Sequence, residues 1–120
     1  MFQFIVTTCF LCLSFFSQGV LASGIANDDA LMSRCVILYD KLQRIESNQH
    51  KAICSVKMSS AANKVESARV RILYKKYRDA RYSLSLAIEE MNFAQGASCT
   101  LISEIKQAKH EAISIKEALD

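Results

Sequence analysis

The stretch LMSRCVILYDKLQRI, residues 31–45, decides the fold class of this 120-residue chain. Its apolar positions recur at spacings of 4, 3, 4 and 3 and are Leu31, Cys35, Leu38, Leu42 and Ile45. That spacing places them on one side of an α-helix. The preceding residues, Asn27, Asp28 and Asp29, favour a helix N-terminus. We therefore predict a helix over residues 28–47, followed by a turn.

A second apolar seam has the same helical spacing and consists of Cys54, Met58, Ala61, Val65, Ala68 and Ile72. It crosses a run of small and polar residues, where Asn63 and Glu66 resemble a capping box. Two interpretations stay open. Either helices cover 50–61 and 63–95, or one helix of about 69 Å covers 50–95.

A third seam follows and consists of Leu73, Tyr77, Ala80, Leu84, Ala87, Met91 and Ala94. The phase shift between Ile72 and Leu73 argues against one strict heptad through the middle of the chain. Gly96 is placed to end a helix and Ser98 to start the next, so the last helix is predicted over 97–119. The expected fold is all-α: a small antiparallel helical bundle of three or four helices with coiled-coil-like seams.

The N-terminal segment is a candidate export signal. Residues 4–16 are mostly apolar, and no charged side chain precedes Asp28. Val20 and Ala22 fit a signal-peptidase site, which predicts a signal peptide over 1–22 and a single domain over 23–120. The alternative is a retained anchor at 4–16, although this run is shorter than the roughly 20 residues of a spanning helix. The expected location is secreted or periplasmic.

Export would leave three cysteines, Cys35, Cys54 and Cys99, in an oxidising compartment. In the predicted first hairpin, Cys35 and Cys54 are offset by roughly 12 Å, beyond the reach of a disulfide. We therefore favour a bridge from Cys99 to Cys54 or to Cys35. The spare thiol could pair with another chain or lie buried, and a fully reduced set is the alternative.

The densest charge cluster contains six cations opposed only by Asp79: Arg69, Arg71, Lys75, Lys76, Arg78 and Arg81. In one continuous helix, part of this cluster shares an outer face with two tyrosines. We call the candidate binding residues the basic–aromatic set: Arg71, Tyr74, Lys75, Arg78, Arg81 and Tyr82. Such a face could bind anionic lipid, polysaccharide or an acidic protein, or could simply be solvated. Nucleic acid is not expected as a partner of an exported protein.

Catalytic and metal-binding patterns are weak. His50 lies in the predicted turn and His110 in the last predicted helix, 60 residues apart along the chain. Glu89 and Glu90 are neighbours, so they point apart on a helix. We expect no enzymatic activity, no cofactor and no metal. The predicted function is that of an exported, non-catalytic helical protein that binds another protein, possible roles being adaptor, inhibitor, assembly factor or self-associating subunit. The alternative is a peripheral envelope protein that binds anionic lipid or polysaccharide through residues 69–82.

Overall fold

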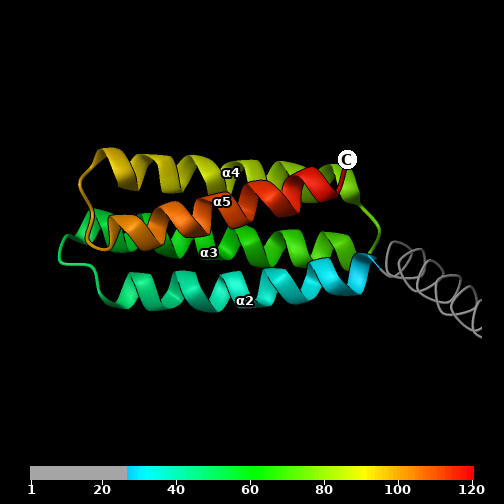
Figure 1. The fold of residues 1–120 in the computed structure, drawn as a ribbon, viewed down its shortest axis with the longest axis horizontal. Coiled ribbons are helices and arrows are strands. Elements are labelled where there is room, and N and C mark those ends of the chain that lie inside the picture. Colours follow the sequence, from blue (N-terminus) through cyan, green and yellow to red (C-terminus); the bar gives the residue numbers. More distant parts are fainter. Residues whose placement is uncertain (1–26) are drawn as a thin grey trace, which may run out of the picture.

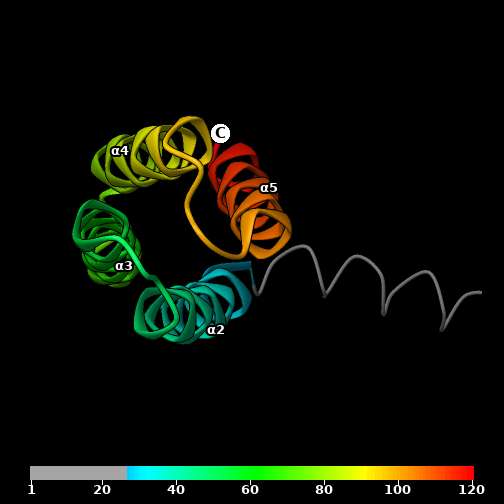
Figure 2. The same cartoon turned by 90° about the vertical axis from the view of Figure 1, so that its left-hand side faces the viewer.

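The computed structural model describes residues 27–120 and shows them as an antiparallel bundle of four α-helices. The helices are α2 (Asn27–Ser47), α3 (Ala52–Leu73), α4 (Tyr77–Gly96) and α5 (Ile102–Ala118) (Figure 1). Each packs on the next, and α5 closes the ring against α2 (Figure 2). The predicted all-α bundle is confirmed. The predicted signal peptide, its cleavage after Ala22 and the alternative anchor lie outside the described residues.

The apolar seams form one core. Every member of the first two seams is buried, as are the apolar positions of the third from Ala80 to Ala94. The other two members of the third seam lie next to the α3–α4 connection, where Leu73 is exposed and Tyr77 is partly buried. Alanine is frequent in the core, which lets neighbouring helices approach closely. Within residues 27–120, no helix combines the length and apolar content needed to cross a membrane.

The middle of the chain departs from both predicted arrangements. α3 continues through residues 59–63, where Ala61 and Ala62 are both buried, so a helix boundary at 61–63 is wrong. A single helix over 50–95 is also wrong, because the chain reverses after Leu73. Lys75 adopts the left-handed conformation, with φ of 60°. Its N–H donates to Ile72 O at 2.9 Å, and Lys76 N–H donates to Arg71 O at 2.8 Å. These two bonds form a Schellman motif that ends α3.

The same motif ends α4, at a position the sequence does not mark with glycine. Gly96 is the last residue of α4, and no glycine among residues 27–120 has a positive φ. Ser98 takes the left-handed position instead, with φ of 56°, and Cys99 N–H donates to Ala94 O at 3.2 Å. The predicted roles of Gly96 and Ser98 are therefore wrong. α5 also begins later than predicted, at Ile102 rather than near 97.

Candidate interaction surface

The basic–aromatic set does not share one helix face. Arg71 lies near the end of α3, Tyr74 and Lys75 form the reversal, and the other three members lie on α4. The helical wheel that grouped them assumed a continuous helix, and the Schellman turn removes that assumption. Within the set, Arg81 reaches α5, where its Nη1 donates to Leu119 O at 2.8 Å. Tyr74 and Tyr82 are both exposed.

Acidic side chains balance most of this basic cluster. Arg71 Nη1 lies 3.5 Å from Asp79 Oδ2, and Arg81 Nε lies 3.3 Å from Asp120 Oδ1. Lys75 Nζ lies 3.0 Å from Asp28 Oδ2. Arg69 pairs with Glu66, so four of the six cations have an acidic partner. Lys76 and Arg78 have none among residues 27–120. This local balance weakens the case for the cluster as a surface for lipid headgroups or acidic polysaccharide.

Asp28 joins the start of α2 to the α3–α4 reversal, a contact that the sequence does not signal. Tyr77 Oη donates to Asp28 Oδ2 at 2.6 Å, beside the Lys75 ion pair. The Tyr77 hydrogen bond, followed by that from Lys75, lowers the pKa of Asp28. The same contacts with the carboxylate raise the pKa of Tyr77 and of Lys75. Lys75 therefore has a structural role in holding the two segments together.

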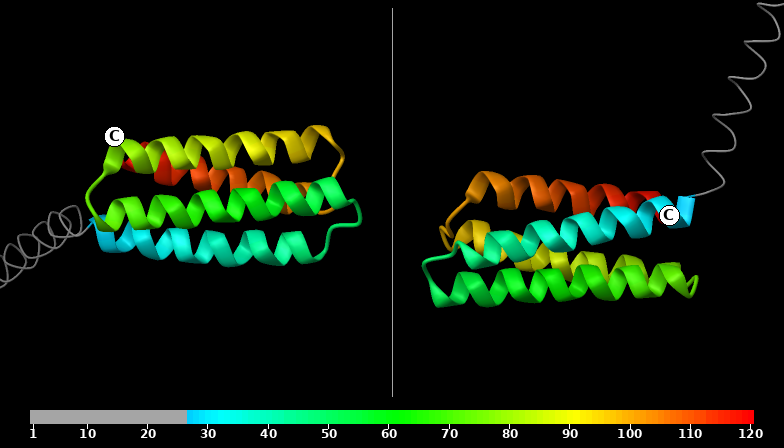
Figure 3. Two further views of the ribbon diagram at one scale, coloured as in Figure 1. Left: turned by 180° about the vertical axis from the view of Figure 1, so that it is seen from behind. Right: turned by 90° about the horizontal axis from the view of Figure 1, so that it is seen from below.

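The largest exposed apolar side chains on the sides of the bundle include several on adjacent helices α3 and α4. Val56 on α3 is 60 % exposed, and Tyr82 and Phe93 on α4 are 66 % and 47 % exposed. Figure 3 (left) shows these two helices side by side on one face of the bundle. We define the α3–α4 face by these residues and their neighbours on the same side: Ile53, Val56, Ser60, Asn63, Lys64, Tyr82, Leu86, Glu89 and Phe93.

Contacts between α3 and α4 fix the register of this face. Ser67 Oγ lies 3.4 Å from Ser83 Oγ in the middle of the helix pair. Near the other end, Lys57 Nζ lies 4.5 Å from the centre of the Phe93 ring and 3.3 Å from Glu90 Oε2. Lys57 thus holds Phe93 by a cation–π contact and helps to keep this ring in a defined position on the surface.

A shallow hollow of about 410 Å³ lies on the outer surface of α3. It is lined by Glu46 of α2 and by six residues of α3, most of them small or short: Ser55, Val56, Ser59, Ser60, Asn63 and Lys64. A second hollow, of about 350 Å³, lies between α2 and α5. In that one the polar side chains already bind each other, since Arg34 Nε donates to Glu111 Oε1 at 2.8 Å and Lys41 Nζ to Gln107 Oε1 at 3.1 Å. The α3 hollow is therefore the more available for a protein side chain.

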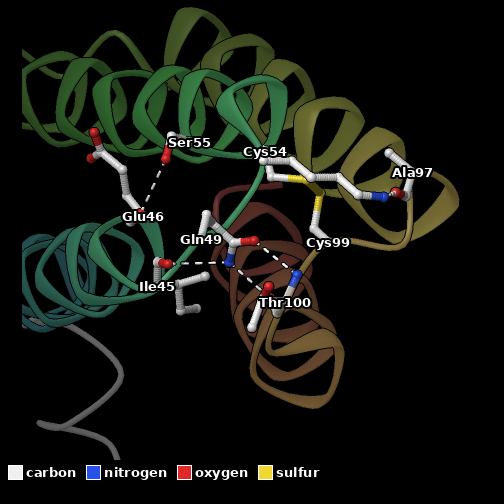
Figure 4. The surroundings of a disulfide bond; sticks show 9 residues. Ile45, Glu46, Gln49, Cys54, Ser55, Ala97, Cys99 and Thr100 are labelled. Carbon is white, nitrogen blue, oxygen red and sulfur yellow. Dashed lines mark hydrogen bonds between the residues drawn. A yellow bond between two sulfur atoms is a disulfide. The ribbon is translucent and has the colours of Figure 1, made fainter.

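The disulfide lies at the end of the bundle that is opposite the α3–α4 reversal (Figure 1). Cys54 and Cys99 are bonded, with their Cα atoms 5.6 Å apart, and the bridge ties the start of α3 to the α4–α5 loop (Figure 4). This is one of the two pairings that the sequence favoured. Cys35 stays free and fully buried, and burial raises the pKa of its thiol to about 11. A buried neutral thiol in the core is not available for a bridge to another chain.

Residues considered for catalysis or metal binding are dispersed. His50 and His110 are both exposed and lie on different parts of the bundle. Within residues 27–120, no three His, Cys, Asp or Glu side chains gather in a group that could hold a metal ion.

No protein-family model matches the chain, and neither the curated proteins nor the solved structures contain a match.

Proposed function

We propose that this protein is an exported, non-catalytic helical module that binds another protein through helix-face packing. The roles of adaptor, inhibitor, assembly factor and self-associating subunit all depend on this one activity. The observation that carries the proposal is the α3–α4 face, where Val56, Tyr82 and Phe93 are exposed on two adjacent helices. These side chains lie outside the core, which is complete without them.

The chemistry of this face suits a protein partner. It combines aromatic and aliphatic side chains with a few charges, a composition typical of the centre of protein interfaces. Covering one large apolar side chain contributes about 1.5–3 kcal/mol before the cost of association. Tyr82 and Phe93 also have few rotatable bonds, so ordering them at an interface costs little conformational entropy.

Export is supported by the Cys54–Cys99 pairing and by the apolar residues 4–16. Structural disulfides persist in oxidising compartments and are rare in reducing ones. The non-reducing intact mass of protein taken from producing cells tests this part of the proposal. We expect a chain that starts at Ser23, with one disulfide and one free thiol. A full-length mass with all thiols reduced would overturn export.

Site-specific photo-crosslinking in the producing cells tests the binding surface. A photoreactive amino acid is placed at position 82 or 93 on the α3–α4 face, or at the exposed control positions 44 and 110 on α2 and α5. We expect a discrete crosslinked protein species from positions 82 and 93 and none from the controls. Crosslinks that arise only at the control positions, or at no position, would contradict the proposed surface.

A further inference from the structure

We infer that the partner of the α3–α4 face is a second copy of this chain. In this dimer, α3 of each copy packs antiparallel against α4 of the other, about a two-fold axis that runs parallel to the helices. The inference rests on the proposed function and names the partner for that same surface. Three features of this face indicate a second copy as the partner. They are its shape, its distribution of charge and the register of its two helices.

The α3–α4 face has a hollow lined mostly by small residues on α3 and apolar side chains beside it on α4. Val56, Ser60 and Asn63 line the hollow, which has a volume of about 410 Å³. On α4, Phe93 is 47 % exposed, and the half-buried Leu86, seven residues earlier, lies on the same side of the helix. One molecule carries both the hollow and the apolar side chains of α4. In a dimer, the hollow of each copy can therefore receive these side chains of the other copy, and the same contact forms twice, as in any isologous interface.

The register of α3 and α4 places the hollow on α3 and Phe93 on α4 at the same level along the helix axes. Inside one copy, Lys57 of α3 is level with Phe93 of α4, as their cation–π contact shows. Rotation about an axis parallel to the helices keeps every residue at its own height. Phe93 of the second copy therefore comes level with Val56 and the hollow of the first, and the reciprocal contact forms at the same height.

The two helices also carry opposite charge on this side. On α3, cations recur at seven-residue intervals, which keeps Lys57, Lys64 and Arg71 on one side of the helix. On α4, Asp79 and Glu90 lie on the side next to α3, where they pair with Arg71 and Lys57 of the same chain. Glu89 lies on the outer side of α4, which also carries Arg78 near the start of the helix. Lys64 and Glu89 make no ion pair within residues 27–120. They are the two charged residues among those that define the α3–α4 face, and within the described residues both are free for contact with another molecule; Arg78, near the start of α4, is also unpaired there.

This charge distribution selects the orientation of the two-fold axis. An axis perpendicular to the helices would place α3 on α3 and bring the lysines of both copies together. An axis parallel to the helices places α3 on α4, so that Lys64 of each copy approaches Glu89 of the other. Like-charge contacts across an interface are costly, so the second arrangement is favoured.

The face is small, and this sets the expected affinity. Two helices, each about 30 Å long and about 10 Å wide, cover roughly 600 Å² per copy. That area is at the low end for specific protein interfaces, so we expect a dissociation constant on the order of 10–100 μM. Sedimentation velocity and light scattering over about 5–500 μM cover this range.

A charge swap at Lys64 and Glu89 tests the inference. The protein is purified from the cells that produce it, in the form in which it occurs there. Lys64→Glu and Glu89→Lys should each weaken dimerisation roughly 5- to 30-fold, since the symmetric interface contains the pair twice. The double variant should restore the wild-type dissociation constant to within about threefold. Arg44→Glu on α2 and Glu104→Lys on α5 make the same charge changes at exposed sites away from the face and should leave it unchanged.

Phe93→Glu provides a second variant and should give a monomer with an unchanged circular dichroism spectrum. A wild-type chain that stays monomeric at 500 μM overturns self-association, and photo-crosslinking to a different protein would then leave the proposed function standing. A dimer that Phe93→Glu does not weaken overturns the α3–α4 face as its interface. Single reversals that weaken the dimer without rescue by the double variant overturn the α3-on-α4 arrangement.

Discussion

The side chain of Gln49 pairs with both backbone polar groups of Thr100. Gln49 Nε2 donates to Thr100 O at 2.7 Å, and Thr100 N–H donates to Gln49 Oε1 at 2.8 Å. Nε2 also donates to Ile45 O at 3.1 Å. One carboxamide thus joins the α2–α3 loop to the α4–α5 loop, next to the disulfide (Figure 4). Backbone groups that would otherwise lack partners in the loop are satisfied by it.

Gln49→Glu should destabilise the bundle by about 2–3 kcal/mol, because a carboxylate oxygen then faces two carbonyl oxygens in place of a donor. Gln49→Ala should cost less, about 1–2 kcal/mol, since water can reach part of the site. Urea unfolding at neutral pH with the disulfide intact measures both values. The control is Gln107→Glu, whose exposed side chain accepts from Lys41, and it should change stability by less than about 0.5 kcal/mol. Equal losses of stability at positions 49 and 107 would show that the hydrogen bonds of Gln49 with Thr100 do not stabilise the bundle.

Asp28→Asn should destabilise the bundle by about 1–2 kcal/mol at pH 7, because charged partners strengthen the bonds from Tyr77 and Lys75. Asp29→Asn is the matched control. Asp29 lies in the same first turn and shares the helix-dipole interaction, but it makes no hydrogen bond or ion pair within residues 27–120. Thermal unfolding of the two variants separates the contact from the dipole.

The pH dependence of Asp28 has a definite sign. Its pKa is lower in the folded protein than in the unfolded chain, so its contribution is present above about pH 4 and is lost as pH falls through the lowered value. Wild type and Asp28→Asn should therefore converge in stability toward pH 2. A difference that stays constant down to pH 2 would show that the charge of Asp28 is not the cause.

Ser98→Gly should stabilise the bundle by about 1 kcal/mol, because Ser98 has φ of 56° and glycine adopts this conformation without strain. Gly96→Ala should also stabilise it, by about 0.5–1 kcal/mol, since Gly96 is helical and a Cβ atom there meets nothing within 4 Å. If Gly96 were the left-handed residue, its replacement by alanine would destabilise instead. Denaturant midpoints of the two variants distinguish these placements.

The apolar seams could be predicted from the sequence because burial alone sets their spacing. Leu31 to Ile45 and Cys54 to Ile72 are buried as the helical period requires. The phase shift between Ile72 and Leu73 was the one local sign of the reversal that follows at Tyr74–Lys76. Left-handed residues at Lys75 and Ser98 could not be predicted, since neither is a glycine or asparagine. Backbone hydrogen bonds, which residue type does not report, hold them there.

The candidate surface was harder to predict than the core. The wheel that grouped Arg71 with Arg78 failed because a turn between them breaks the helical phase. The ion pairs of Lys75 with Asp28 and of Arg81 with Asp120 join residues distant in sequence, so charge counting within one segment missed them. Of the predicted binding residues, Tyr82 is among the residues that define the α3–α4 face, and Arg71 lies on the same side of α3 near its end. Phe93 and Val56 carried no signal beyond being apolar off the seams.

Cys35 should make stability fall at alkaline pH. Its thiol is fully buried, and its pKa is raised to about 11, whereas the unfolded chain ionises near the ordinary value of about 8.5. The folded state therefore keeps a proton that the unfolded state releases, and stability should drop by up to about 1.4 kcal/mol per pH unit above pH 9. Below pH 8 this residue should contribute no slope.

Urea unfolding of wild type and Cys35→Ala at pH 7 and pH 10 measures this effect. Lysines and tyrosines also titrate near pH 10, and they are common to both chains, so the difference between the two slopes isolates the thiol. Cys35→Ala should be less stable at pH 7, because it leaves a small cavity, and should lose less stability than wild type at pH 10. The native thiol should also react with a disulfide reagent only as fast as the protein unfolds. Rapid labelling at pH 7, or parallel pH profiles, would place Cys35 outside the core.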